Sequence, residues 1–233
     1  MTEPLDKIMI EKNNVSALNQ LSEENLFQTF NNAGKRRFLF VGNSITRHGP
    51  KPEIGWENDW GMAASKKEND YVHVTVAMLE KIEGEIDYCI VNCGEWETEY
   101  YNEKVLEKYF DVRDFRADTI IIRIGENIWN ARDKFQEYSL EIYFEKLVKF
   151  FASCESARVI ITGMFWPHEE IEASLEVVAK KMGVPFVKLD DLCVDENMAI
   201  GQYAHGGVCL HPNDEGMRKI AERIVCAINN FRV

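Results

Sequence analysis

One stretch decides the fold of this chain, and it reads Phe38-Leu39-Phe40-Val41-Gly42-Asn43-Ser44-Ile45-Thr46. A short apolar run like this one is typical of a strand that is buried on both faces of a parallel sheet. Gly42 and Asn43 break the strand and leave Ser44 at its carboxyl end. Ligands and catalytic groups gather at that end of open α/β sheets. A serine there can also be the N-cap of a following helix, so both interpretations of Ser44 stay open at this point.

The rest of the chain alternates apolar runs with helical patterns. Further strands are predicted at residues 86–93, 119–124, 158–162 and 185–189. Helices are predicted over residues 70–82, 102–110, 135–151, 169–182 and 214–231. With the strand at 37–41, this alternation predicts an α/β fold. We expect a three-layer α/β/α sandwich around a flavodoxin-like, five-stranded parallel sheet.

The chain divides into an extension, residues 1–34, and a main domain, residues 35–233. The extension is predicted to be helical, because Ser22 precedes Leu26, Phe27 and Phe30 with the pattern of a capped amphipathic helix; a short strand is predicted at 5–10. It packs either on the domain or on a partner subunit. A homo-oligomer is therefore left open.

Composition excludes several classes of function. The net charge of -12 disfavours nucleic acid and anionic membranes as partners, since both attract clustered lysine and arginine. The sequence shows neither a signal-peptide pattern nor an apolar run of membrane-spanning length. None of the six cysteines has zinc-site spacing, and several lie in apolar runs, which favours reduced thiols. We expect a cytoplasmic protein with a small-molecule partner.

Four residues fall where predicted parallel strands end or where the last helix begins: Ser44, Gly94, Asn127 and His211. Such positions meet at one rim of a doubly wound sheet. A serine becomes a nucleophile at neutral pH when a base, most often histidine, takes its proton. An oxyanion that develops in such a reaction needs hydrogen-bond donors already in place.

Three blocks of the chain resemble those of the SGNH/GDSL hydrolases: Gly42-Asn43-Ser44-Ile45-Thr46, Gly125-Glu126-Asn127 and His211-Pro212-Asn213-Asp214-Glu215-Gly216-Met217. They occur in the family's order over residues 36–231. The resemblance implies that residues 35–233 are an SGNH-hydrolase-like catalytic domain without metal or organic cofactor. It implies Ser44 as the nucleophile and His211 as the base. The oxyanion donors would be the N–H groups of Ser44 and Gly94 and the Asn127 amide.

Two departures from the family pattern matter. The usual acid, three residues before the histidine, is replaced by Val208, which predicts a Ser-His dyad. His211 would then be oriented by a carbonyl of residues 206–209, or by an acid from elsewhere in the chain; the candidates are Asp190, Asp191, Asp195 and Glu196. The second block is one residue short, so the oxyanion N–H could come from Gly94 or from residues 95–97.

The expected function is hydrolysis of a carboxylic ester, with a short acyl group such as acetyl on a carbohydrate or small molecule. Tryptophans near the rim would wall the substrate pocket, or would simply belong to the core; they are Trp56, Trp60, Trp96 and Trp166. The alternative is a weakly active or inactive protein that binds a carbohydrate or acylated ligand on the same fold. The missing acid at position 208 motivates this alternative.

Overall fold

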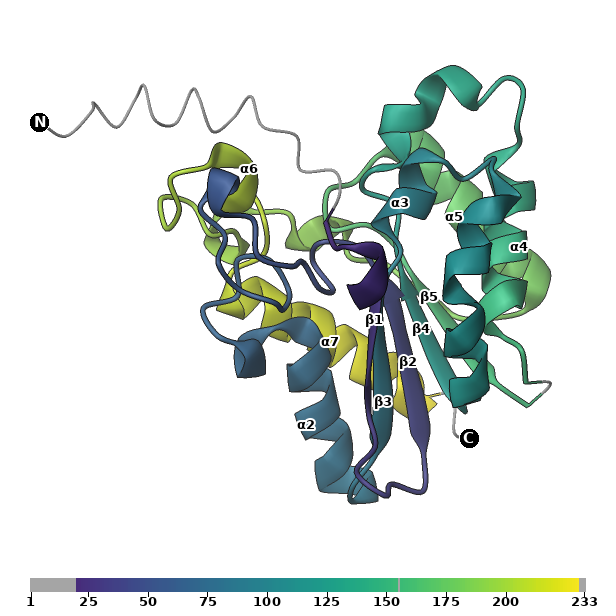
Figure 1. Ribbon diagram of the computed structural model, residues 1–233, viewed down its shortest axis with the longest axis horizontal. Coiled ribbons are helices and arrows are strands. Elements are labelled where there is room, and N and C mark those ends of the chain that lie inside the picture. The colour runs from purple at the N-terminus through teal and green to yellow at the C-terminus, as the bar shows by residue number, and fades with distance from the viewer. Residues whose placement is uncertain (1–19, 155, 231–233) are drawn as a thin grey trace, which may run out of the picture.

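A six-stranded sheet is the centre of the structure, a computed structural model that describes residues 20–154 and 156–230 (Figure 1). The strands run in the spatial order β1-β3-β2-β4-β5-β6. All neighbours from β3 to β6 are parallel, and taken in chain order these five strands lie 2-1-3-4-5. This is the flavodoxin-like order, so the predicted parallel sheet is confirmed. The strands are β1 (Phe27–Phe30), β2 (Arg37–Gly42), β3 (Asp87–Asn92), β4 (Thr119–Arg123), β5 (Arg158–Thr162) and β6 (Phe186–Val187).

Helices cover both faces of the sheet (Figure 1). Successive residues of a strand point to opposite faces, so Phe38 and Phe40 pack in one apolar cluster while Leu39 and Val41 pack in another. The first cluster includes residues of α2 (Tyr71–Glu83) and α7 (Asp214–Asn230). The second includes residues of α3 (Gly94–Thr98), the 3₁₀ helix η4 (Glu103–Phe115), α4 (Leu140–Phe151) and α5 (Glu169–Met182).

Helix boundaries differ from the predictions in two places. The helix predicted at 135–151 begins at Leu140, because the Ser139 hydroxyl accepts a hydrogen bond from Ile142 N (3.4 Å) and caps it there. The segment predicted as a helix at 102–110 is the longer 3₁₀ helix η4. The remaining 3₁₀ helices are η1 (Glu23–Asn25), η2 (Pro52–Ile54), η3 (Lys67–Asn69), η5 (Ile128–Lys134), η6 (Asp190–Leu192) and η7 (Asp195–Asn197).

The prediction of a helix beginning at Ser22 is wrong. Only η1 follows this serine, and Phe27–Phe30 is the edge strand β1, antiparallel to β3. Phe30 stacks on Tyr88 of β3, with ring centroids 4.4 Å apart, so its apolar side chain is used across the strand pair. Residues 20–34 thus contribute a strand to the main sheet. The strand predicted at 5–10 lies outside the described residues.

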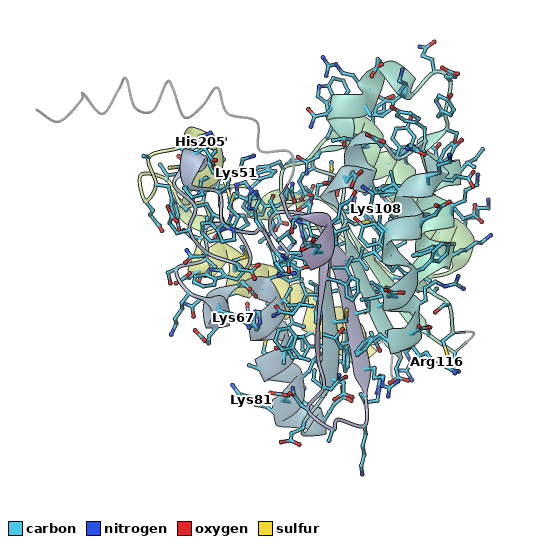
Figure 2. All side chains as sticks on the ribbon, in the orientation of Figure 1. Lys51, Lys67, Lys81, Lys108, Arg116 and His205 are labelled. Carbon is cyan, nitrogen blue, oxygen red and sulfur yellow. The ribbon has the colours of Figure 1, made fainter. Side chains whose placement is uncertain are left out.

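Two long loops meet beyond the carboxyl end of the sheet: the first is residues 43–70, between β2 and α2, and the last is residues 188–213, between β6 and α7. Residues of the first loop, including Ile54 and Met62, form an apolar cluster with Ala199 and Val208 of the last loop. The last loop also carries the short helix α6 (Gly206–Cys209). Figure 2 shows Lys51 and His205 together at this end of the molecule. The first loop also contacts the residue at the carboxyl end of β2, since Met62 N donates to the Ser44 carbonyl at 2.9 Å.

No helix within residues 20–154 and 156–230 is long and apolar enough to cross a bilayer.

Candidate active site

Ser44 lies in a tight turn directly after β2. Thr46 N and Arg47 N both donate to the Asn43 carbonyl, at 2.9 and 3.0 Å, and close the turn. Gly42 is required here, since an added Cβ would lie 1.8 Å from Thr46 Oγ1. No helix starts at this turn, and the Ser44 hydroxyl bonds to His211 instead. The N-cap interpretation of Ser44 is therefore wrong.

The side chains of Ser44 and His211 meet although 167 residues separate them. Ser44 Oγ is 2.9 Å from His211 Nε2, and His211 Nδ1 is 2.7 Å from the Gly207 carbonyl oxygen. A carbonyl can only accept, so Nδ1 carries the proton and Nε2 presents its lone pair to the Ser44 hydroxyl. This is the tautomer that a general base for Ser44 requires.

Burial shapes the acid–base behaviour of His211. Its side chain is 6% exposed, and this burial lowers the pKa of His211 to about 3, although the hydrogen bond to Gly207 acts in the opposite direction. The nearby His48 lowers the pKa of His211 further. The imidazole is therefore neutral at physiological pH and free to accept a proton. Among the described residues no carboxylate bonds to its ring; the charge of Glu126 raises the pKa of His211, and that of Arg123 lowers it.

Val208, which stands where the resemblance would place an acid, belongs to the apolar cluster between the two long loops. Val208 is 1% exposed. The four acids considered as substitutes, at positions 190, 191, 195 and 196, are all exposed. None of them has a hydrogen bond to His211 in the described part of the chain, and Asp191 pairs with Arg223. A backbone carbonyl from residues 206–209 was one of the two predicted partners of His211, and Gly207 is in that position.

An aspartate at position 208, where the resemblance would place an acid, should not provide His211 with a new partner. In Val208→Asp the carboxylate would enter an apolar cluster without a partner while Nδ1 stays on Gly207. We expect a loss of about 3 kcal/mol or more in the free energy of unfolding, with no gain in ester hydrolysis. Urea unfolding of Val208→Asp and of the near-isosteric Val208→Thr gives their free energies of unfolding, and the difference between them measures the cost of burying the charge. Faster hydrolysis by Val208→Asp would show that an acid at this position can reach His211.

Two of the three predicted oxyanion donors remain available. Ser44 N has no acceptor among the described residues. Asn127 Nδ2 donates one of its two N–H bonds to Glu97 Oε2, 2.5 Å away, and has a second to offer. Gly94 does not behave as expected, because its N–H donates to Asn92 Oδ1 at 2.9 Å. Gly94 instead allows a close approach, since an added Cβ would lie 2.8 Å from Gln20 Oε1.

The four tryptophans divide into two groups. Trp166 lies beside His211, with ring centroids 4.8 Å apart, and Trp60 is half-buried with its indole N–H on the Ala64 carbonyl. Trp56 is fully buried in the loop cluster and Trp96 is 1% exposed in the core.

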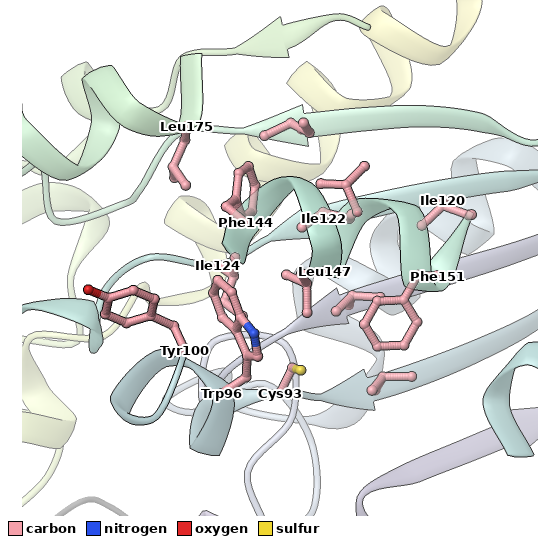
Figure 3. Close-up of a cluster of buried hydrophobic side chains, with 14 of the residues drawn as sticks. Cys93, Trp96, Tyr100, Ile120, Ile122, Ile124, Phe144, Leu147, Phe151 and Leu175 are labelled. Atoms are coloured by element: carbon pink, nitrogen blue, oxygen red, sulfur yellow. The ribbon is translucent and has the colours of Figure 1, made fainter. Parts of the chain in front are cut away.

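Figure 3 shows Trp96 among Cys93, Tyr100 and Phe144 in the apolar layer on one face of the sheet. It borders a surface cavity of about 430 Å³ whose lining includes neither Ser44 nor His211. The substrate-wall prediction is wrong for Trp56 and Trp96, which are core residues.

A buried polar network that was not predicted from the sequence lies beneath the turn that carries Ser44. Asn43 Nδ2 donates to Glu97 Oε1 (2.9 Å) and to Glu126 Oε2 (2.6 Å), while Asn43 Oδ1 accepts from the guanidinium of Arg123 (2.6 Å). One sequence signal was available. Asn43 stands where the resemblance would place an acid before Ser44, while Glu97 and Glu126 are acids in the short second block and in the block at 125–127. In the described residues no group of three or more histidine, cysteine or acidic side chains could hold a metal ion.

Comparisons with known proteins identify the fold. No family model and no curated protein matches the chain. Among solved structures, it is similar to a catalytic mutant of an acetylxylan esterase from Geobacillus stearothermophilus, with 16% identity, 84% of this chain and 94% of the other covered, and a TM-score of 0.52.

Two proteins named as GDSL-like lipases are also similar, each with a TM-score of 0.54 and 84% of this chain covered. The one from Bacteroides uniformis is 15% identical over 97% of its own chain, and the one from Parabacteroides merdae is 16% identical over 96%. The protein therefore has the α/β fold of the GDSL-like hydrolases, as the three sequence blocks predicted.

Proposed function

We propose that this protein is a serine hydrolase of carboxylic esters that works through a Ser44–His211 dyad. The observation that carries the proposal is the 2.9 Å contact between Ser44 Oγ and His211 Nε2, with the opposite ring nitrogen held by Gly207. The fold shared with GDSL-like lipases and an acetylxylan esterase supports it.

The reaction follows from this geometry. His211 Nε2 takes the hydroxyl proton as Ser44 Oγ attacks the ester carbonyl, and the negative charge moves to the carbonyl oxygen. Ser44 N–H and the free N–H of the Asn127 amide stabilise that oxygen. The imidazolium then protonates the leaving alcohol. Water, deprotonated by His211, releases the acid from the acyl-enzyme.

The preferred substrate is an ester with a short acyl group, acetyl foremost, on a carbohydrate or another small alcohol. Ser44 and His211 are each only 6% exposed, which favours a small acyl group over a long chain. Trp166 beside His211 offers an aromatic face on which a sugar ring or a small alcohol can pack. Acetyl esters of carbohydrates are what the similar esterase is named for.

An acyl-chain series tests this preference. With p-nitrophenyl esters, kcat/KM should fall by about 10-fold or more from acetyl to octanoyl, since even a single methylene that the pocket excludes costs about 1–3 kcal/mol. Measured rates must be corrected for spontaneous hydrolysis, which is fastest for acetate. A kcat/KM that rises with chain length would contradict a short-acyl pocket.

A binding protein without turnover is the second candidate. It is favoured by the partner of His211 Nδ1, which in the described part of the chain is a carbonyl and not a carboxylate. The lowered pKa of His211 also makes the imidazole a weak base. Damage to the acid's role in a Ser-His-Asp enzyme costs up to about 10⁴-fold in kcat. The two candidates differ in whether Ser44 is chemically reactive.

A further inference from the structure

Glu97 is the centre of the buried network beneath the nucleophile turn. It lies in α3 and is fully buried. Its Oε1 accepts from Gly125 N (2.6 Å) and Asn43 Nδ2 (2.9 Å), and its Oε2 accepts from Asn127 Nδ2 (2.5 Å). One carboxylate therefore joins the residue before Ser44 to the side chain of Asn127.

The orientation of the Asn127 amide depends on Glu97 Oε2 being a hydrogen-bond acceptor. An asparagine side chain has an oxygen and an NH₂ group of almost equal size, so hydrogen bonding decides which way it points. With a carboxylate beside it, the amide must turn its NH₂ toward Glu97 and keep its oxygen away. The second N–H of the same nitrogen is then held in place as a donor, which an oxyanion needs before the reaction begins.

The network contains two buried acids, Glu97 and Glu126, and burying a carboxylate is unfavourable unless a cation compensates it. Arg123 bonds Glu126 at 2.6 Å and, against the effect of burial, lowers the pKa of Glu126, so this pair is neutral overall. Glu97 forms no ion pair of its own with the described residues. Burial, and then the charge of Glu126, raise the pKa of Glu97. The other titratable groups near Glu97 are Arg123, Cys93 and Tyr109, all buried, and the charge of Glu97 contributes to raising the pKa of Arg123. A neutral glutamine would suit the same space at least as well for stability.

We propose that Glu97 is a positioning residue of the ester hydrolase, whose carboxylate fixes the Asn127 amide as an oxyanion donor and ties it to the turn that carries Ser44. This inference rests on the proposed function. In Glu97→Gln one oxygen can still accept from Gly125 and Asn43. The new NH₂ group of the substituted side chain would face Asn127. The Asn127 amide would then turn its oxygen toward this NH₂ group, and its own NH₂ would no longer be held as an oxyanion donor.

A double-mutant cycle with Glu97→Gln and Asn127→Ala tests the proposal, with p-nitrophenyl acetate as the probe. Asn127→Ala should lower kcat by about 10²-fold or more, the usual loss of one oxyanion donor. Glu97→Gln should lower kcat by about 10-fold or more, with little change in KM, and the double variant should be no slower than Asn127→Ala alone. Thermal unfolding of Glu97→Gln should be at or above the wild-type temperature.

Glu99→Gln is the matched control, because Glu99 lies one residue after α3 and bonds only to Asn102 among the side chains of the described residues. It should keep wild-type kcat. The positioning role would be overturned if the two losses in kcat multiplied in the double variant, or if Glu97→Gln had the kcat of the wild type. Either result would leave the proposed ester hydrolysis intact. If the wild type neither hydrolyses the ester nor reacts at Ser44, the proposed function fails and this inference fails with it.

Discussion

Ser44→Ala is expected to lower hydrolysis of p-nitrophenyl acetate by about 10⁴-fold or more, to near the rate without enzyme. The reason is that, in the proposed mechanism, Ser44 Oγ forms the bond to the acyl carbon, and the substitution removes this atom. Binding and oxyanion stabilisation remain, so a small residual rate above water is compatible with the mechanism. Initial rates of purified wild type and variant, each corrected for spontaneous hydrolysis, measure the effect.

The fold should tolerate this substitution. Ser44 Oγ has one described partner, His211 Nε2, and the turn itself is closed by backbone bonds to Asn43. We expect the unfolding temperature of Ser44→Ala to lie within a few degrees of wild type, since a single modest hydrogen bond is lost, worth about 1 kcal/mol. Hydrolysis that survives in the variant would assign the activity to another group.

His211→Ala should have the second largest effect, a loss of about 10³-fold or more in kcat, because His211 is the only base that bonds to Ser44 Oγ among the described residues. The two residues act as one unit, so the double variant with Ser44→Ala should be no slower than Ser44→Ala alone. Losses that multiply would mean that Ser44 and His211 act in separate steps. Circular dichroism at the assay temperature checks that the buried ring is not needed for folding.

The same histidine has a predictable effect of pH on stability. Its pKa is lowered in the folded protein to about 3, so the unfolded chain binds its proton first as the pH falls. The stability that the neutral ring contributes is fully present above about pH 6.5 and is lost progressively toward pH 3. His211→Ala should remove this part of the acid destabilisation.

Much of the fold and part of the site follow from local sequence patterns. The five parallel strands are short apolar runs that end in polar turns, and their order along the chain fixes the sheet. Because parallel strands share a carboxyl rim, Ser44, Asn127 and His211 could be placed there from the sequence. The edge strand β1 could not, since it has four residues and its phenylalanines fit an amphipathic helix as well.

The features that escaped prediction are products of tertiary packing. The network of Asn43, Glu97 and Arg123 brings together residues 54 and 80 apart in the chain. From the sequence alone a glutamate such as Glu97 looks like a surface residue, because its partners come from other strands and turns. Trp56 is in the core because two distant loops meet around it. The Gly94 N–H is the exception, since it donates to the Asn92 side chain two residues earlier in a local Asx turn.

The central claim is that Ser44 is an activated nucleophile, and covalent labelling tests it most directly. Wild type and Ser44→Ala are incubated with a fluorophosphonate, digested, and analysed by mass spectrometry for the modified peptide. We predict a stoichiometric adduct on Ser44 in the wild type and none on this peptide in the variant. An unmodified Ser44 in folded wild-type protein would contradict the enzyme and support the binding protein.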